Sequence, residues 1–413
     1  MANQLARLRQ RIDAVSIAPA RRGSAIVVRD LFRAPSSTYA LILGVTLFLV
    51  VFGVTMVLSS SSVEQYRATG DAFGAFLRQG AYAMIGVPAM LLASRVPARL
   101  WRRWAGRIVL GGLLVQAAVV LTPLGYSIQG NRNWIRIGSF TAQPSELLKL
   151  ALCLAVGTIL CTRRRRLDDW RGALLPAAVV AAAAIGLVLA GKDLGTALIM
   201  MTLVFGALFV GGVRVRHLAV AVAVLASLLP VAVLTSGSRS GRIAAWLRGC
   251  PGGGPDQDLC WQPVHGQWAL AHGGVFGVGL GNSKMKWSWL PEADNDFIFA
   301  IVGEELGLIG GVVVLGMFVL LTGGMMQVVR RTTDPFARAT TGGVLTWIVV
   351  QALVNVAVVL GLLPVLGVPL PLISAGGSAL ITSLVAIGVV LSFARDLPAS
   401  VDSSSQPHSG EPR

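Results

Sequence analysis

Long uninterrupted apolar runs are the feature that most restricts how this chain can fold. They recur along most of the sequence, and each is close to the ~20 residues that an α-helix needs to cross a bilayer. Apolar residues make up 54% of the 413 residues, and charged residues only 13%. A soluble domain of this length does not need so much apolar sequence. The chain is therefore predicted to be an all-α polytopic membrane protein.

Membrane-spanning helices are expected at ten places. Their ranges are 39–59, 79–98, 107–124, 145–161, 173–191, 196–212, 217–235, 297–326, 341–363 and 377–394. Together they form one membrane domain over 39–396, preceded by a basic tail at 1–38. The final segment, 397–413, is rich in Ser and Pro and is predicted to be disordered. No cleavable signal peptide is expected, because the first apolar run is long enough to span.

The formal net charge of +16 makes nucleic-acid binding the obvious competing interpretation. However, the arginines cluster in short connections after the second, fourth, sixth and eighth expected spans. Because positive residues mark cytoplasmic connections, both termini are predicted to be cytoplasmic, and no nucleic acid is expected as a partner. A much longer connection, 236–296, then lies outside the membrane between the seventh and eighth spans. Long structured loops usually carry function.

Two of the four cysteines, Cys250 and Cys260, lie in this long outer segment. An oxidising compartment and the intervening Gly and Pro residues favour a disulfide between them. Cys153 and Cys161 lie in an apolar run and are expected to stay reduced. No Cys/His spacing resembles a metal site, so the sequence assigns no metal ligand.

An acidic turn closes the outer segment and leads directly into the eighth span. Glu292, Asp294 and Asp296 lie at this boundary, and Glu304 and Glu305 follow inside the apolar run. Carboxylates at membrane depth are costly and favour a functional interpretation. The alternative is a helix cap, because Asp or Asn at a helix start satisfies free backbone N–H groups. The residues alone leave both interpretations open.

Charged residues also stand at two other outer positions. Lys149 lies about one turn inside the fourth span, three residues after Glu146, so the two share a helix face. They either form an ion pair, or Lys149 joins Arg132 and Arg136 in binding a phosphate. Asp193 lies in the short turn before the sixth span, where a structural turn is the alternative to function.

Pro and Gly residues interrupt the apolar sequence at 361–378. Non-helical backbone at membrane depth is tolerated only where protein buries it or where it lines a wet cavity. A broken helix beside a substrate groove is therefore expected here. Gln351 and Asn355 lie four residues apart on one helix face and are predicted to hydrogen-bond to a neighbouring helix.

These motifs together resemble those of the SEDS family, of which FtsW and RodA are members. DFIFAIVGEELGLIG, starting at Asp296, and GGVFGVGLGNS upstream carry most of the likeness. QPSELLK, DLGT and PLPLISAGG are similar to other family motifs and stand in the family's order. GEELG and LISAGG resemble the division branch, FtsW, more than RodA. The composition and the Cys-bearing loop resemble actinobacterial examples.

The resemblance implies a glycosyltransferase that polymerises lipid II into peptidoglycan, at the outer face of the cytoplasmic membrane and during cell division. It implies Asp296 as the general base, inversion at the donor carbon, and undecaprenyl pyrophosphate as the leaving group. Substrate-binding candidates are Arg132, Trp134, Arg136, Glu146, Lys149, Asp193, Arg242, Lys284, Lys286, Glu304 and Ser374. Expected partners are lipid II, undecaprenyl lipids, a class B penicillin-binding protein and other divisome membrane proteins at the septum. No cofactor is assigned, although Mg or Mn would suit the pyrophosphate.

Two other functions remain open. Glu304, Glu305 and Lys149 within apolar sequence would also suit a lipid II flippase or other membrane transporter. A divisome scaffold without catalysis is the other alternative. A transporter needs ionisable groups near the midplane, whereas the acidic and basic residues of this chain are densest on the outer side.

Because successive helical residues differ by ~100°, Glu304 is expected to face the active cavity and Glu305 to be structural.

Overall fold

The computed structural model describes residues 36–128, 130–138, 140–234, 237–250 and 257–397. The predictions for the N-terminal tail before residue 36 and for the C-terminal tail after residue 397 lie outside these ranges. All the described residues belong to one compact unit of the chain.

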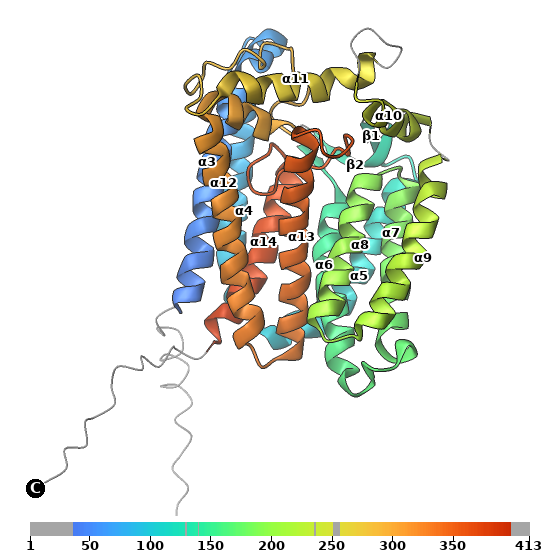
Figure 1. Ribbon diagram of the computed structural model, residues 1–413. Coiled ribbons are helices and arrows are strands. Elements are labelled where there is room, and N and C mark those ends of the chain that lie inside the picture. The colour runs from blue at the N-terminus through green and yellow to red at the C-terminus, as the bar shows by residue number, and fades with distance from the viewer. Residues whose placement is uncertain (1–35, 129, 139, 235–236, 251–256, 398–413) are drawn as a thin grey trace, which may run out of the picture. The chain divides into compact units, whose positions relative to one another are not determined.

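Helices account for most of the described chain, and each predicted span corresponds to one of them (Figure 1). They are α3 (Ser37–Thr69), α4 (Gly74–Ala93), α5 (Ala98–Leu121), α6 (Pro144–Thr162), α7 (Leu175–Ala190), α8 (Leu194–Val210), α9 (Val215–Leu234), α12 (Ile298–Arg331), α13 (Pro335–Val359) and α14 (Gly377–Arg395). Within the described residues, eight helical segments are long and apolar enough to cross a membrane, while α8 and part of α9 are shorter apolar helices. The predicted class, an all-α polytopic membrane protein, is confirmed, and the count of ten spans stays a prediction.

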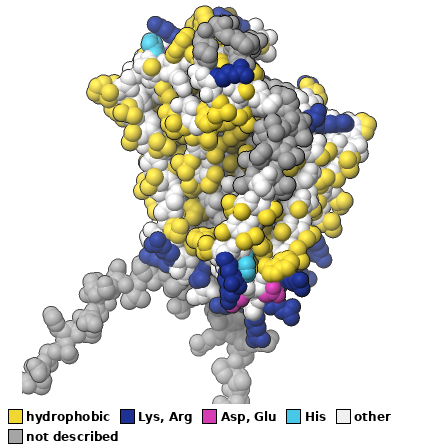
Figure 2. Space-filling view, turned by 45° about the vertical axis from the view of Figure 1, so that its right-hand side comes forward, with side chains coloured by type: hydrophobic (Ala, Val, Ile, Leu, Met, Phe, Trp, Pro, Cys, Tyr) yellow, Lys and Arg dark blue, Asp and Glu magenta, His cyan; other side chains and the backbone are white. Residues whose placement is uncertain are grey.

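The helices alternate in direction, so the Arg-rich connections meet at one end of the bundle. Arg95, Arg163, Arg214 and Arg330 are all exposed at or next to these connections. Figure 2 shows Lys and Arg side chains around the lower end of the molecule and a broad apolar surface above them. Lys and Arg side chains also lie at the upper end, and the placement of the lower end in the cytoplasm stays a prediction.

A small antiparallel sheet follows α5, where the sequence analysis expected only a loop. Its strands are β1 (Gly125–Ile128), β2 (Asn131–Ile137) and β3 (Phe140–Ala142), in the order β1-β2-β3. The connections contain Gly130 and Gly138 with φ of 85° and 62°, a conformation that favours glycine in tight hairpins. Alternation along β2 buries Asn133 and exposes Arg132 and Arg136.

The long outer segment contains α10 (Gly237–Leu247) and α11 (Gln257–Gly273). Both lie at the end of the bundle opposite the turn that joins α12 to α13 (Figure 1). Much of the segment is therefore folded into helices.

Two breaks in regular helix lie at this same end. Residues 360–376, between α13 and α14, are not helical, and several of their apolar side chains are buried, as the prediction of a broken helix requires. The second break was not predicted and lies inside α12, where Gly307 has φ 67° and ψ −165°. The carbonyls of Glu304 and Glu305 there accept hydrogen bonds from the N–H groups of Val278 and Gly279, at 3.0 Å each.

Candidate functional site

Asp296 lies in a turn just before α12, at the end of the bundle that carries α10 and α11. Its main-chain oxygen accepts a hydrogen bond of 2.7 Å from Nδ2 of Asn355 on α13. The same Nδ2 donates to the carbonyl of Val368, at 2.8 Å. The turn is thus fixed to both α13 and the non-helical segment 360–376. A helix cap does not explain Asp296, because the N-cap of α12 is Phe297 and no side chain caps it.

Ser374 and Gln79 hold the residues next to Asp296. Ser374 Oγ donates to the carbonyl of Asn295 at 2.7 Å and accepts from the N–H of Leu370 at 2.8 Å. Gln79 Nε2 on α4 donates to the carbonyl of Ser374, at 3.1 Å. Ser374, a substrate-binding candidate, is therefore occupied in positioning the acidic turn. Sequence reasoning missed Gln79, for which the only signal was one amide side chain next to an apolar run.

The Asp296 side chain is partly buried and lies beside Gly367. Burial, followed by the negative charges of Glu292 and Asp193, raises the pKa of Asp296 to about 7, against the opposing influence of Arg242. Among the described residues, no donor forms a hydrogen bond with its carboxylate. A carboxylate with such a pKa can accept a proton near neutral pH.

Asp294 has different neighbours, although it lies only two residues away. Burial, Glu292 and Glu64 raise the pKa of Asp294 to about 6, and Arg78 opposes this rise. Glu64 lies on α3 and Arg78 on α4, whereas the groups that act on Asp296 include Asp193 before α8 and Arg242 on α10. The two carboxylates therefore face different parts of the bundle.

Asp193 is the N-cap of α8, so its role is structural, although the structural alternative predicted from the sequence was a turn. Its Oδ1 accepts from the N–H of Thr196 at 2.9 Å, and its Oδ2 accepts from Nε2 of Gln143 at 2.8 Å. Both oxygens are thus used within the protein. The remaining influence of Asp193 on the site is its negative charge near Asp296.

Lys149 is enclosed between α6 and α13 and does not reach an open site. Its side chain is only 2% exposed, and its Nζ forms an ion pair of 2.9 Å with Glu146. Nζ also donates to Oε1 of Gln351, at 3.1 Å, and lies 4.7 Å from the ring centre of Trp347. The structure therefore supports the ion-pair alternative, and neither Lys149 nor Glu146 is placed to bind a phosphate.

Glu304 is fully buried and bonded to other protein groups, whereas helical periodicity predicted that it faces the active cavity. Its side chain is fully buried and accepts hydrogen bonds from Ser283 Oγ and from the N–H of Lys284, at 3.0 Å in the second case. His272 Nδ1 lies 3.0 Å from its Oε1. Glu304 therefore fixes the segment before the acidic turn to the start of α12.

Glu305 is also buried and structural, as expected. It accepts from Ser59 Oγ on α3 at 2.6 Å and pairs with Lys286 Nζ at 3.5 Å. Lys286 additionally donates to the carbonyl of Gly281, at 2.5 Å. Lys286 is therefore committed to a buried ion pair, and only Lys284 of the two lysines has an exposed side chain.

The remaining candidates lie on the sheet and on α10. Arg132 donates from Nη2 to the carbonyl of Thr122 at 2.7 Å, and the Arg136 guanidinium lies 5.6 Å from the ring centre of Tyr126. Both are exposed, and Trp134 beside them is partly buried. Both guanidinium groups are therefore accessible to an anion.

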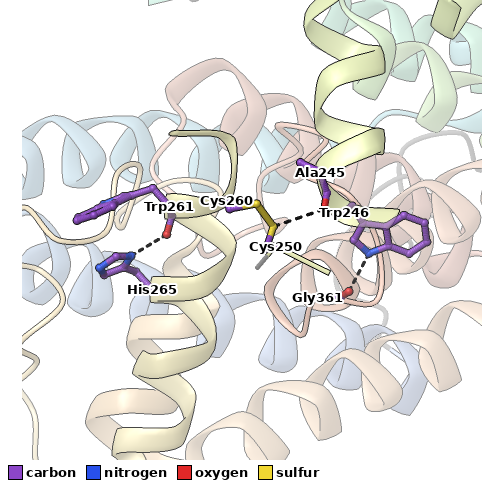
Figure 3. Close-up of a disulfide and its surroundings, with 7 residues drawn as sticks. All are labelled: Ala245, Trp246, Cys250, Cys260, Trp261, His265 and Gly361. Carbon is purple, nitrogen blue, oxygen red and sulfur yellow. Dashed lines mark hydrogen bonds between the residues drawn. A yellow bond between two sulfur atoms is a disulfide. The ribbon is translucent and has the colours of Figure 1, made fainter. Parts of the chain in front are cut away.

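Arg242 borders a small cavity of ≈ 110 Å³ between α10, α11 and the segment after α13. Its Nη1 donates to the carbonyl of Val365, at 3.4 Å. Trp246 closes the same cavity and donates from Nε1 to the carbonyl of Gly361 at 2.9 Å (Figure 3). The cavity is too small for a disaccharide on a lipid. Arg242 at its border nevertheless acts electrostatically on Asp296.

The structure places a disulfide between Cys250, after α10, and Cys260, near the start of α11 (Figure 3). It joins the two helices that flank the cavity. Among the described cysteines, Cys153 and Cys161 are free.

In the described part of the chain, no group of three His, Cys, Asp or Glu side chains is arranged to hold a metal ion.

Fold and site together define a polytopic helical membrane protein with a partly buried acidic site at one end of its helices. The family model described as "Cell cycle protein", which covers FtsW, RodA and SpoVE, matches residues 39–398. The chain belongs to this FtsW/RodA/SpoVE family, the SEDS family that its motifs resemble.

Individual relatives agree with this assignment. The chain is 37% identical over 371 residues to the probable peptidoglycan glycosyltransferase FtsW of Mycobacterium bovis, covering 89% of this chain and 70% of that protein. It is 39% identical to the protein of the same name from Geobacter metallireducens, covering 83% and 91%. It is 33% identical to the stage V sporulation protein E of Bacillus subtilis, covering 85% and 95%.

Solved structures show the same fold. The RodA protein of Thermus thermophilus superposes with a TM-score of 0.64 at 27% identity, covering 89% of this chain and 98% of that one. A chain of a peptidoglycan synthase complex, described as coordinating polymerization and crosslinking, superposes with a TM-score of 0.68 at 28% identity and covers 85% and 97%.

Proposed function

We propose that this protein polymerises lipid II into glycan strands at the outer face of the cytoplasmic membrane during cell division. The names of its FtsW relatives support the activity and the process. The observation that carries the proposal is the Asp296 carboxylate, which is partly buried, held in a fixed turn and has its pKa raised to about 7.

In the proposed reaction, Asp296 accepts the proton of the acceptor sugar hydroxyl. The hydroxyl oxygen forms a bond to the anomeric carbon of the donor sugar, on the side opposite the pyrophosphate. The bond from that carbon to the pyrophosphate oxygen breaks, undecaprenyl pyrophosphate leaves, and the configuration inverts. A base with a pKa near the working pH suits this step.

The leaving pyrophosphate requires positive charge to stabilise it. Arg242 is the best-placed cation, since it influences Asp296 directly. Arg132, Arg136 and Lys284 are exposed and could complete the anion site. If the reaction uses Mg or Mn, we propose that the ion arrives with the pyrophosphate, because Mg²⁺ is commonly held by few carboxylates and by substrate phosphates.

We further propose that the protein works with a class B penicillin-binding protein and other divisome membrane proteins at the septum. The structural relative in a peptidoglycan synthase complex supports a partner that cross-links the strands. Lipid II and undecaprenyl lipids would reach the site from the bilayer.

Transport is less well supported than catalysis. Lys149, Glu304 and Glu305, the ionisable groups that suggested a transporter, are all buried and paired with protein groups. They therefore do not provide the accessible charges near the midplane that transport needs.

The decisive experiment compares Asp296→Asn with Asp294→Asn in polymerisation of purified lipid II, with and without a cognate transpeptidase. Asparagine keeps the size of the side chain but cannot accept the proton. Polymerisation by Asp296→Asn protein should fall by about 10²-fold or more, while lipid II binding persists. Asp294→Asn should cost little. Normal polymerisation by Asp296→Asn, with inactive Asp294→Asn, would transfer the role to Asp294.

A further inference from the structure

α11 presents three different faces, because each residue turns the helix by about 100°. One face packs against α12: Leu270 lies against Gly303, and Gly266 lies against the ring of Phe297. A second face, with Pro263 and Gln267, lines the cavity next to α10. The third face carries Trp261, His265 and Trp268 and points about 150° away from each of the other two.

Trp289, from the segment just before the acidic turn, joins this third face. Its ring is nearly parallel to those of Trp261 and His265, at 15° in both cases, with centroid distances of 6.1 and 6.0 Å. Trp261 and His265 stack at 4.0 Å, and Trp268 lies 4.8 Å from His265. We call these four side chains the aromatic ladder.

Hydrogen bonds from α11 to the segment before the acidic turn hold the aromatic ladder in place. Trp261 Nε1 donates to the carbonyl of Trp289 at 2.8 Å, and Gln262 Nε2 donates to the carbonyl of Pro291 at 3.1 Å. Even so, Trp261, Trp268 and Trp289 remain 37%, 55% and 53% exposed. Flat aromatic surface is thus fixed in place and left uncovered by the described part of the protein.

His265 gives the ladder a polar group. It is only 4% exposed, and its Nδ1 lies 2.7 Å from the carbonyl of Trp261. A carbonyl can only accept, so Nδ1 carries the proton and Nε2 of the neutral ring is a hydrogen-bond acceptor. Among the described residues, none is hydrogen-bonded to Nε2.

The ladder is directly connected to the candidate active site. Trp289 and Pro291, which receive the hydrogen bonds from α11, precede Asp294 and Asp296 by a few residues in the same turn. These two hydrogen bonds therefore fix the ladder to the segment that carries the proposed base.

We propose that the aromatic ladder is a binding subsite for the pyranose rings of the glycan strand. A pyranose presents axial C–H groups on one face, and the electron-rich face of an indole attracts such polarised C–H groups. The acceptor on His265 suits a sugar hydroxyl. An interfacial Trp belt requires only that its rings lie level with the ends of the spanning helices, whereas Trp261, His265 and Trp289 stack face to face.

This subsite deepens the proposed function, since a polymerase that adds many units must hold the strand between additions. It rests on the proposed function only for the identity of the strand. Binding of the sugar can be measured without turnover, so the two proposals can fail separately.

The first test is binding of soluble GlcNAc–MurNAc oligosaccharides, obtained by muramidase digestion of peptidoglycan, to full-length protein carrying Asp296→Asn. Isothermal titration should detect binding to this parent. Adding Trp268→Ala or Trp289→Ala should weaken it about tenfold, the scale of one lost aromatic contact. Trp289→Phe should restore most of it. Trp170 lies outside the outer segment, and its side chain is similarly exposed, at 47%. Trp170→Ala is therefore the matched control and should bind the oligosaccharides like the parent.

The second test is strand length with lipid II and active protein. Trp268→Ala should shorten the strands by roughly threefold relative to Trp170→Ala, because strands dissociate sooner. Trp268 contacts the ladder through His265, and its removal leaves the Trp261–Trp289 hydrogen bond intact, so the variant should keep the outer segment folded.

Three outcomes decide between the proposals. Ladder-dependent binding by a protein that polymerises nothing would support the subsite and defeat the proposed function. Unchanged binding and unchanged strand length in the ladder variants would overturn the subsite alone. Loss of stimulation by the transpeptidase, with binding and strand length intact, would show that the ladder is a protein-docking surface and would also overturn it.

Discussion

Asn355 on α13 donates a hydrogen bond to the main-chain oxygen of Asp296, 2.7 Å away and 59 residues earlier in the chain. With the bond from the same amide to Val368, it joins the acidic turn, α13 and the segment before α14. The position of the proposed base therefore depends on an amide from a helix to which Asp296 does not belong.

Replacing that amide should impair catalysis more than folding. Asn355→Leu keeps the branched shape and the number of heavy atoms but removes both hydrogen bonds, so the Asp296 turn loses its fixed position. We expect the polymerisation kcat to fall by roughly 10²-fold, the cost of misplacing a reacting group by about 1 Å. Leu353→Ala, on the exposed side of the same helix, is the control and should retain activity. Equal activity of the two variants would show that Asn355 does not position the base.

The pH dependence of polymerisation should report the Asp296 carboxyl group. A general base works only when it is deprotonated, and burial and nearby acids raise the pKa of Asp296 to about 7. The rate constant should therefore rise tenfold per pH unit below about 7 and level off above it. Initial rates at saturating lipid II from pH 5 to 9 measure this. A rate independent of pH between 5 and 8 would exclude Asp296 as a base with this pKa.

The buried ion pair between Glu305 and Lys286 should matter for stability. Glu305→Gln leaves the Lys286 ammonium without its counter-charge, and such a loss costs about 3–5 kcal/mol. The Tm in detergent should drop clearly. Lys286→Met added to Glu305→Gln removes the unpaired charge and should recover part of the loss. If the double variant is as unstable as the sum of the single variants, the two side chains are not coupled.

Gly307 should tolerate no side chain. Its φ of 67° with ψ of −165° is nearly restricted to glycine, and a Cβ would meet backbone atoms of Val275 and Gly277. Gly307→Ala should destabilise the protein by at least about 1–3 kcal/mol. Gly316→Ala in the same helix is the matched control, because nothing lies within 4 Å of its Cβ position. It should be neutral or stabilising by up to about 1 kcal/mol. A similar Tm for both variants would contradict the assigned conformation.

The Cys250–Cys260 disulfide should lower the number of free thiols that can be labelled in the unreduced protein. Unreduced, denatured protein should react with maleimide at Cys153 and Cys161 only, and mass spectrometry should find Cys250 and Cys260 linked. Cys250→Ser should loosen the contact of α10 with α11, at a cost of roughly 2–3 kcal/mol for this short loop. Two further free thiols at Cys250 and Cys260 would disprove the bond.

Local sequence was enough to predict the helices and the acidic turn. In a bilayer, an apolar run of about 20 residues must satisfy its own backbone groups, and the α-helix does so within the run. Helix ends were less predictable: α3 continues past the predicted residue 59 to Thr69, because polar residues can extend a helix beyond the membrane. The sheet after α5 depends on short strands whose pattern is weak beside the apolar runs.

The charged residues show where local sequence stops being sufficient. Asp296 could be singled out because an acid before an apolar run is costly, and Glu146 with Lys149 because they share a helix face. The burial of Glu304 against segment 274–286 could not be foreseen, because it depends on that segment folding over the break at Gly307. The pairing of Lys286 with Glu305 and of Asn355 with Asp296 joins residues far apart in the chain. Such contacts follow from which helices pack together, and only the tertiary structure decides that.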